Sequence, residues 1–124
     1  MRVYNKTNII PAATRMNTTI NSTPMNLVSI YGFSIQVVWT GTPTGSFKLQ
    51  ASSDVADSQL ANAQMLPTNW SDVTNSSYAV TAAGNYMWNV SDAMYTWVRV
   101  VYTDTSGGVS TAQIASCTLA AKGV

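Results

Sequence analysis

Residues 33–39 have the sequence FSIQVVW, in which every second side chain is large and apolar. Side chains alternate between the two faces of a strand, so this spacing predicts a strand with one buried face. The same alternation resumes in FKLQA at residues 47–51. Between them, GTPTG at residues 41–45 sets a proline between two glycines, which is typical of a turn. We therefore expect residues 33–40 and 46–53 to pair as a β-hairpin.

Other short segments also have strand composition and are separated by turn residues. Residues 95–102 (YTWVRVVY) are the most β-prone run, and apolar side chains on both faces predict a central strand. A flexible hairpin loop is expected at residues 104–108. Residues 109–119 alternate weakly and include small side chains, which favours an edge strand or a subunit-contact strand. Further strands are predicted at residues 16–20, 70–73, 78–81 and 86–90.

The predicted fold class is all-β: an antiparallel, jelly-roll-like β-sandwich of about eight strands. No helical segments of about 10–15 residues separate the strands, as an α/β fold would require. The one long interruption is residues 54–68, where residues 57–65 could form one or two helical turns or an ordered surface loop. A chain of 124 residues is typical of one domain, and we assign residues 16–124 to it.

The first fifteen residues differ from the rest of the chain. Residues 1–15 have no clear periodicity and are interrupted by Pro11, so we expect an extended N-terminal arm. Arg2, Lys6 and Arg15 are the only charged residues before Lys48. The arm is either a solvated tail or a segment that docks on an acidic neighbour. In the second case these three basic residues would take part in assembly.

The composition leaves little machinery for catalysis. The chain has no histidine, and its five acidic residues are all aspartates. The chain therefore has few side chains suited to general acid–base catalysis, and a Ser-His-Asp or Cys-His arrangement is excluded. We expect no enzyme, no cofactor and no metal site. Asp54 and Asp57 could hold Ca²⁺ weakly, but aspartates in turns normally bond their own backbone. The single cysteine, Cys117, is predicted to be a buried apolar residue.

Charge and hydropathy narrow the choice of partners. A net charge of +1 does not favour nucleic acid or an anionic membrane as the partner. The first thirty residues contain no continuous apolar core of a signal peptide, and no run of about 20 apolar residues could span a bilayer. We expect synthesis in a cytoplasm.

Aromatic residues are the remaining candidates for ligand binding. Four tryptophans and six tyrosines could stack on sugar rings if they lined an exposed face. Each tryptophan lies in or beside a predicted strand, which favours packing in the core or at subunit interfaces instead. Arg99 lies in the most apolar strand. It should extend to the surface or pair with an aspartate such as Asp72 or Asp92.

Three segments occur in a distinctive order: GTPTGSFKLQASSD at residues 41–54, NWSD at residues 69–72 and YTWVRVVY at residues 95–102, with Lys122-Gly123 closing the chain. Together they resemble a recurring β-sandwich module in structural proteins of tailed bacteriophages. The resemblance covers roughly residues 25–124. It implies a β-sandwich virion component, such as a capsid decoration protein, head fibre base or tail accessory domain. With that role we expect a homo-oligomer located in the virion and made in the host cytoplasm. The resemblance implies virion proteins as partners and brings no catalytic residues.

A second function remains open beside the virion role. A carbohydrate-binding module or receptor-binding domain would present two or three aromatic side chains on one exposed face, with a glycan as the ligand.

Overall fold

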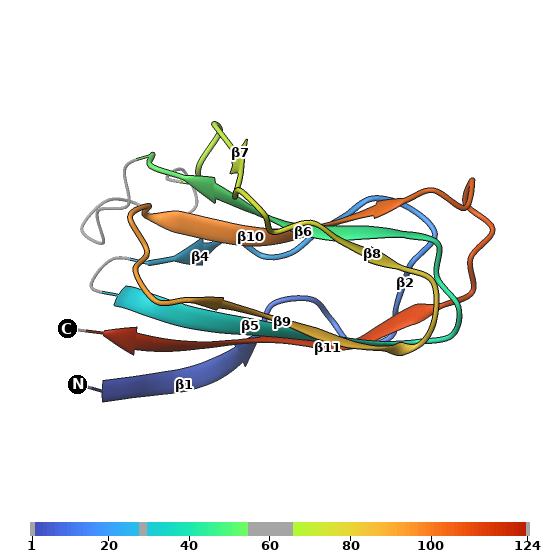
Figure 1. Ribbon diagram of the computed structural model, residues 1–124, viewed down its shortest axis with the longest axis horizontal. Helices are drawn as coiled ribbons and strands as arrows, with labels where there is room; N and C mark the ends of the chain where they lie inside the picture. The colour runs from blue at the N-terminus through green and yellow to red at the C-terminus, as the bar shows by residue number, and fades with distance from the viewer. Residues whose placement is uncertain (1, 28–29, 55–65, 124) are drawn as a thin grey trace.

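The computed structural model describes residues 2–27, 30–54 and 66–123, which form two antiparallel sheets packed face to face (Figure 1). These residues contain eleven strands and no helix. The described part of the chain therefore has no helix that is long and apolar enough to cross a membrane. The strands are β1 (Arg2–Asn8), β2 (Thr14–Arg15), β3 (Ile20–Asn21), β4 (Met25–Asn26), β5 (Ile30–Thr40), β6 (Gly45–Ser52), β7 (Ser71–Asp72), β8 (Tyr78–Val80), β9 (Gly84–Val90), β10 (Trp97–Asp104) and β11 (Gln113–Gly123). The predicted antiparallel β-sandwich is confirmed. The predicted helical turns at residues 57–65 lie outside the described residues.

The two sheets differ in how their edges are built. In the five-stranded sheet the order is β1-β11-β5-β9, and β2 pairs with β11 beyond the end of β1. In the six-stranded sheet β10 and β6 lie at the centre. Short strands β3 and β4 pair with the outer side of β10, and β7 and β8 pair with the outer side of β6. The two chain termini lie at the same end of the molecule (Figure 1).

The core lies between the sheets and follows the alternation seen in the sequence. Every second residue of β5 from Phe33 to Trp39 is buried, as predicted. Strands β6 and β10 of the other sheet contribute alternating buried side chains from the opposite side of the core. These side chains, all fully or almost fully buried, are Phe47 and Leu49 of β6 and Val98, Val100 and Tyr102 of β10.

The predicted hairpin between residues 33–40 and 46–53 is wrong. β5 pairs with β11 and β9, whereas β6 pairs with β10, β7 and β8 in the other sheet. The connecting loop is itself packed: Pro43 is fully buried, and a Cβ on Gly41 would lie 2.9 Å from the Cα of Ala112. The two apolar strand faces therefore meet across the core rather than side by side, which buries both of them.

The loop at residues 104–108 also crosses between sheets, so the predicted hairpin there is wrong as well. It connects β10 of one sheet with β11 of the other. The Asp104 carboxylate accepts hydrogen bonds from the backbone N–H of Ser106 at 2.9 Å and of Gly108 at 3.0 Å. An aspartate that bonds its own turn in this way was expected, and it orders the crossing.

Strand β10 occupies the centre of its sheet, as predicted for residues 95–102. Val98 and Val100 are buried on one face, and Trp97 and Val101 on the other. The last strand differs from its prediction as an edge or contact strand. β11 lies between β1 and β5, and a register shift between Ile114 and Ser116 opposite β5 breaks the simple alternation that would have indicated a central strand.

The N-terminal segment is extended, as expected, but it is not an arm outside the sandwich. Residues 2–8 form β1 and pair antiparallel with β11, with Arg2 opposite Gly123 and Asn8 opposite Thr118. The side-chain oxygen of Asn8 accepts a hydrogen bond from the backbone N–H of Cys117 at 3.0 Å. Pairing with β11 satisfies one side of the β1 backbone, which sequence periodicity alone could not indicate.

Candidate functional site

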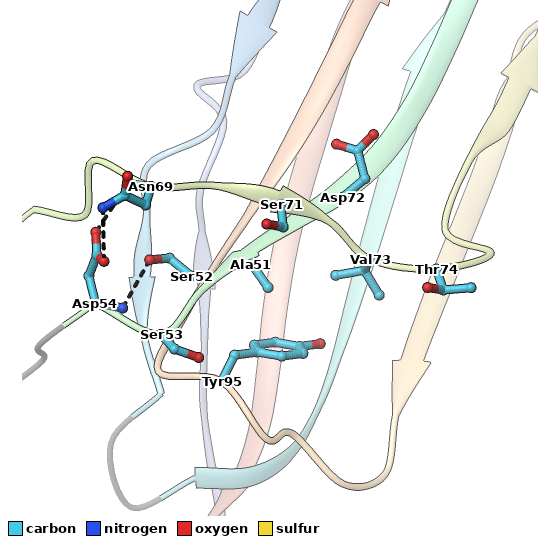
Figure 2. A pocket seen from close by; sticks show the side chains of 10 residues that line it. All are labelled: Ala51, Ser52, Ser53, Asp54, Asn69, Ser71, Asp72, Val73, Thr74 and Tyr95. Atoms are coloured by element: carbon cyan, nitrogen blue, oxygen red, sulfur yellow. Dashed lines mark hydrogen bonds between the residues drawn. The ribbon is translucent and has the colours of Figure 1, made fainter.

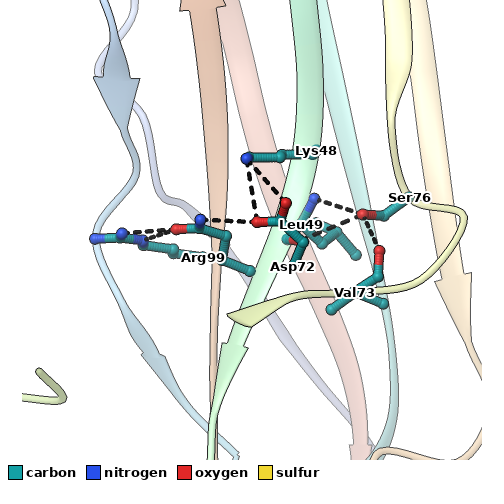
Figure 3. A network of polar contacts seen from close by, with 7 residues as sticks. Lys48, Leu49, Asp72, Val73, Ser76 and Arg99 are labelled. Carbon is teal, nitrogen blue, oxygen red and sulfur yellow. Dashed lines mark hydrogen bonds and ion pairs between the residues drawn. The ribbon is translucent and has the colours of Figure 1, made fainter. Parts of the chain in front are cut away.

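A polar network lies on the outer face of the six-stranded sheet (Figure 3). Lys48 and Gln50 alternate along β6 with the buried Phe47 and Leu49, and they therefore point away from the core. Asp72 of β7 lies beside them: its carboxylate is 3.1 Å from the Lys48 ammonium and accepts a hydrogen bond from the Gln50 amide at 2.9 Å. The hydrogen bonds from Gln50 and then from Lys48 lower the pKa of Asp72.

Arg99 joins the same network from β10. Its Nε and Nη2 donate to the side-chain oxygen of Gln50 at 3.0 Å and 2.6 Å. The guanidinium carbon also lies 4.3 Å from the ring centre of Trp70, a cation–π contact. Arg99 was expected to extend to the surface or pair with Asp72 or Asp92. It reaches Asp72 only through Gln50, and burial lowers its pKa.

Beneath this network, Ser76 ties the segment between β7 and β8 to β6 (Figure 3). Its hydroxyl accepts from the backbone N–H of Leu49 at 3.0 Å and donates to the carbonyl of Val73 at 2.7 Å. The indole N–H of Trp88 donates to the Ser76 carbonyl at 2.7 Å. Buried polar groups need such partners, so this serine fixes the position of β7 and hence of Asp72.

A surface pocket of about 680 Å³ opens at the end of β6, next to β7 (Figure 2). Asp54 lies at its rim and accepts hydrogen bonds from the backbone N–H of Thr68 at 2.8 Å and of Asn69 at 3.1 Å. These bonds lower the pKa of Asp54. Tyr95 lines the pocket, and within the described residues its buried hydroxyl has no hydrogen-bond partner. The lining offers hydroxyl, amide and carboxylate groups for binding.

In the part of the chain that the structure describes, no group of three or more His, Cys, Asp or Glu side chains comes together to form a candidate metal site. Asp57, the second residue of the weak Ca²⁺ pair considered from the sequence, lies outside the described residues.

Two of the four tryptophans, Trp39 and Trp88, pack in the core, as the core interpretation predicts. Trp97 is buried on the outer face of β10, and Trp70 lies beneath the Arg99 guanidinium. The indole N–H of Trp39 donates to the carbonyl of Ala82 at 2.6 Å, so its polar atom is satisfied within the protein. Within the described residues, the tryptophans therefore do not form the exposed row that a glycan-stacking face would use.

Cys117 is buried, as predicted. Burial raises the pKa of its thiol to about 12. The thiol therefore stays protonated near neutral pH, and a protonated thiol is a poor nucleophile.

The three predicted assembly residues lie along one edge of the five-stranded sheet but not in one cluster. Arg2 and Lys6 belong to β1, whereas Arg15 ends β2 and donates from Nε to the carbonyl of Ser110 at 2.9 Å. Arg2 pairs with Gly123 and Arg15 with Gln113 of β11, which separates them by roughly 30 Å at the rise of a strand.

Sequence reasoning did not single out Lys48 and Gln50. Their position in an alternating strand indicates that their side chains lie on its polar face. The sequence does not indicate that β7 and β10 lie on either side of that strand.

No protein-family model matches the sequence, and a sequence search of curated proteins gives no match. Among solved structures, the chain is similar to a coat protein dimer of Tobacco streak virus, with a TM-score of 0.48 and 9% identity over 96% of this chain and 84% of that chain. The Tobacco streak virus coat protein in its C2 crystal form gives a TM-score of 0.43 and 9% identity over 97% of this chain and 87% of that chain.

Proposed function

We propose that this protein is a non-enzymatic structural component of a bacteriophage virion, a capsid decoration protein or a head or tail accessory protein, which associates with itself and with other virion proteins. The observation that carries the proposal is the position of β1 at an outer edge of the five-stranded sheet. An edge strand has free backbone groups on which a neighbouring protein can dock. Arg2 and Lys6 add positive charge to this edge. The resemblance to phage structural modules supports the same role.

The chemistry of the side chains agrees with a structural role. The chain has no histidine, and the Cys117 thiol is buried. Asp54, Asp72 and Asp104 each accept hydrogen bonds that hold turns or strands in place. These carboxylates are committed to structure, and their lowered pKa values make them poor general bases near neutral pH.

Binding to phage particles tests the proposal. Purified protein is mixed with particles of the phage that encodes it, prepared without this protein, and co-sedimentation is measured. We expect the wild type to bind and Lys6→Glu to bind at least tenfold more weakly, because it reverses a charge on the docking edge. Lys122→Glu makes the same charge change on β11, which lies between β1 and β5 and not at the edge of the sheet. This variant should bind like the wild type. Wild-type protein that never sediments with particles would refute the proposal.

A glycan-binding role is the second candidate, favoured by the pocket at the end of β6. Its hydroxyl and amide groups and the ring of Tyr95 are groups that sugars bind. Screening the wild type and Asn69→Ala against a glycan array tests it. Binding that Asn69→Ala abolishes would support this role, and no binding by the wild type to any glycan would remove it.

A further inference from the structure

The four sheet edges of the sandwich are not equally protected against pairing with a second copy of the same chain. Natural proteins protect edges with very short strands, charges, proline or bulges. Both edges of the six-stranded sheet consist of strands of two or three residues, β3 and β4 on one side and β7 and β8 on the other. The β1 edge carries Arg2 and Lys6 and has a register shift between Tyr4 and Thr7. Three of the four edges are therefore guarded.

The fourth edge, β9, has none of these devices. Its seven residues, GNYMWNV at positions 84–90, include no charge and no proline. They pair with β5 without a register shift, from Gly84 opposite Trp39 to Val90 opposite Phe33. Among the described residues, β9 is thus a neutral strand in unbroken register with β5, and no strand pairs with the backbone groups on its outer side.

Apolar side chains are exposed along the same side of the sandwich. Met87, on the outer face of β9, is 43% exposed. Tyr78 of β8 is 37% exposed and stacks on Tyr86 of β9, with ring centres 4.0 Å apart and planes 21° apart. This stack closes the gap between the edges of the two sheets, which lie at the same side of the molecule (Figure 1). A strand added to β9 would cover this apolar surface as well as the backbone.

The sequence of β9 indicates which strand would fit. It is nearly symmetric about Met87: Tyr86 and Trp88 flank it, and Asn85 and Asn89 lie one position further out. In an antiparallel pair about a two-fold axis through Met87, Asn85 faces Asn89 of the partner subunit. Tyr86 likewise faces Trp88 of the partner subunit. Amides oppose amides and aromatic rings oppose aromatic rings, which are favourable cross-strand pairs.

We propose that two copies of this chain associate through β9, antiparallel and about a two-fold axis at Met87, so that their five-stranded sheets become one continuous sheet. A two-fold contact needs a surface complementary to itself, and β9 meets that need without bringing like charges together. The same arrangement at β1 would bring Arg2 and Lys6 of two copies close to one another. This inference rests on the proposed assembly function and names the surface through which the protein associates with itself.

The first test is the mass of the purified protein in solution, measured by sedimentation velocity. We expect a dimer for the wild type and a monomer for Met87→Lys, because two like charges would meet at the axis. Met94→Lys is the matched control: Met94 is 84% exposed and lies outside β9, so this variant should remain a dimer. Circular dichroism establishes that each variant is folded.

The second test reads the register by cysteine cross-linking. Residues directly opposite in an antiparallel pair have Cα atoms about 4.5–5.5 Å apart, within the range of a disulfide. Under mild oxidation, Met87→Cys alone should form a covalent dimer. Asn85→Cys alone should not, whereas a mixture of Asn85→Cys and Asn89→Cys should. Cys117 is buried and should not interfere.

Failure of this inference is distinguishable from failure of the proposed function. A wild type that stays monomeric at high concentration and a Met87→Cys variant that does not cross-link would overturn the β9 contact, even if the protein still binds to particles. A β9 dimer that never binds to particles would leave this inference standing and refute the virion role.

Discussion

Gly45 packs directly against Tyr102 in the core of the sandwich. A Cβ at position 45 would lie 2.6 Å from the hydroxyl oxygen of Tyr102 and would also collide with the backbone carbonyl of Thr103. Gly45 begins β6 opposite Asp104 of β10, so the close approach sits where the two central strands of the six-stranded sheet begin to pair. The absence of a side chain here is therefore a packing requirement rather than a need for an unusual backbone angle.

Gly45→Ala is expected to lower the free energy of unfolding by about 2–3 kcal/mol, because overpacking against a backbone atom cannot be relieved by a rotamer change. Urea denaturation measures it. Gly84→Ala is the matched control, since its Cβ would meet only Trp39, at an ordinary 3.8 Å, and should cost less than about 0.5 kcal/mol. Equal stability of the two variants would contradict the prediction.

The hydroxyl of Tyr102 leads to a second prediction. It is fully buried and has no hydrogen-bond partner within the described residues. An unsatisfied buried hydroxyl is costly, so its removal should not destabilise the fold. Tyr102→Phe should be as stable as the wild type, or up to about 1 kcal/mol more stable, in urea denaturation. A loss of 1 kcal/mol or more would mean that the hydroxyl has a partner.

The longer strands β5, β6, β9 and β10 and much of the core could be predicted from the sequence, but β1 and the pairing of the strands could not, and of the strand predicted at residues 16–20 only Ile20 is in a strand. The alternation in residues 33–39 predicts which side chains are buried, but it does not indicate which strand pairs with this one. A five-residue GTPTG connection suits both a hairpin and a crossing between sheets. The burial of Pro43 and the contact of Gly41 with Ala112 decide for the crossing, and both depend on the packed structure.

The same limit applies to the outer network. The sequence indicated that Arg99 needs a partner or an exit to solvent, because it lies among valines. Gln50 is its partner only because β6 and β10 pair in a register that sets the two residues opposite each other. Asp72 joins them through the two-residue strand β7, which no periodicity in so short a segment could reveal.

Asp54 predicts a dependence of stability on acid. Its pKa is lowered from the ordinary 3.8, chiefly by the backbone hydrogen bonds from Thr68 and Asn69. A lowered pKa in the fold contributes stability above the unfolded pKa, and that stability is lost as the pH falls through the folded pKa. Asp54→Asn should therefore be less stable than the wild type at pH 7, and the difference should shrink below a pH of about 4. Urea denaturation from pH 7 to pH 2.5 measures it.

The matched control for the acid prediction is Asp92→Asn, an exposed aspartate in the turn after β9. This variant should be as stable as the wild type at pH 7, within about 0.5 kcal/mol. A difference for Asp54→Asn that does not change with pH would contradict the proposed role of its carboxylate.

The bridge from Arg99 through Gln50 to Asp72 predicts that the three side chains are energetically coupled. Arg99→Met and Gln50→Met, separately and together, form a double-mutant cycle whose coupling energy should be about 0.5–1 kcal/mol, since the contacts are charge-assisted but partly exposed. Arg99→Met with Lys48→Met should show a smaller coupling, because Lys48 contacts Asp72 and not Gln50. Urea denaturation of the variants at low and at high salt measures both cycles. A coupling for Arg99 with Gln50 no larger than that with Lys48 would show that the network does not act through Gln50.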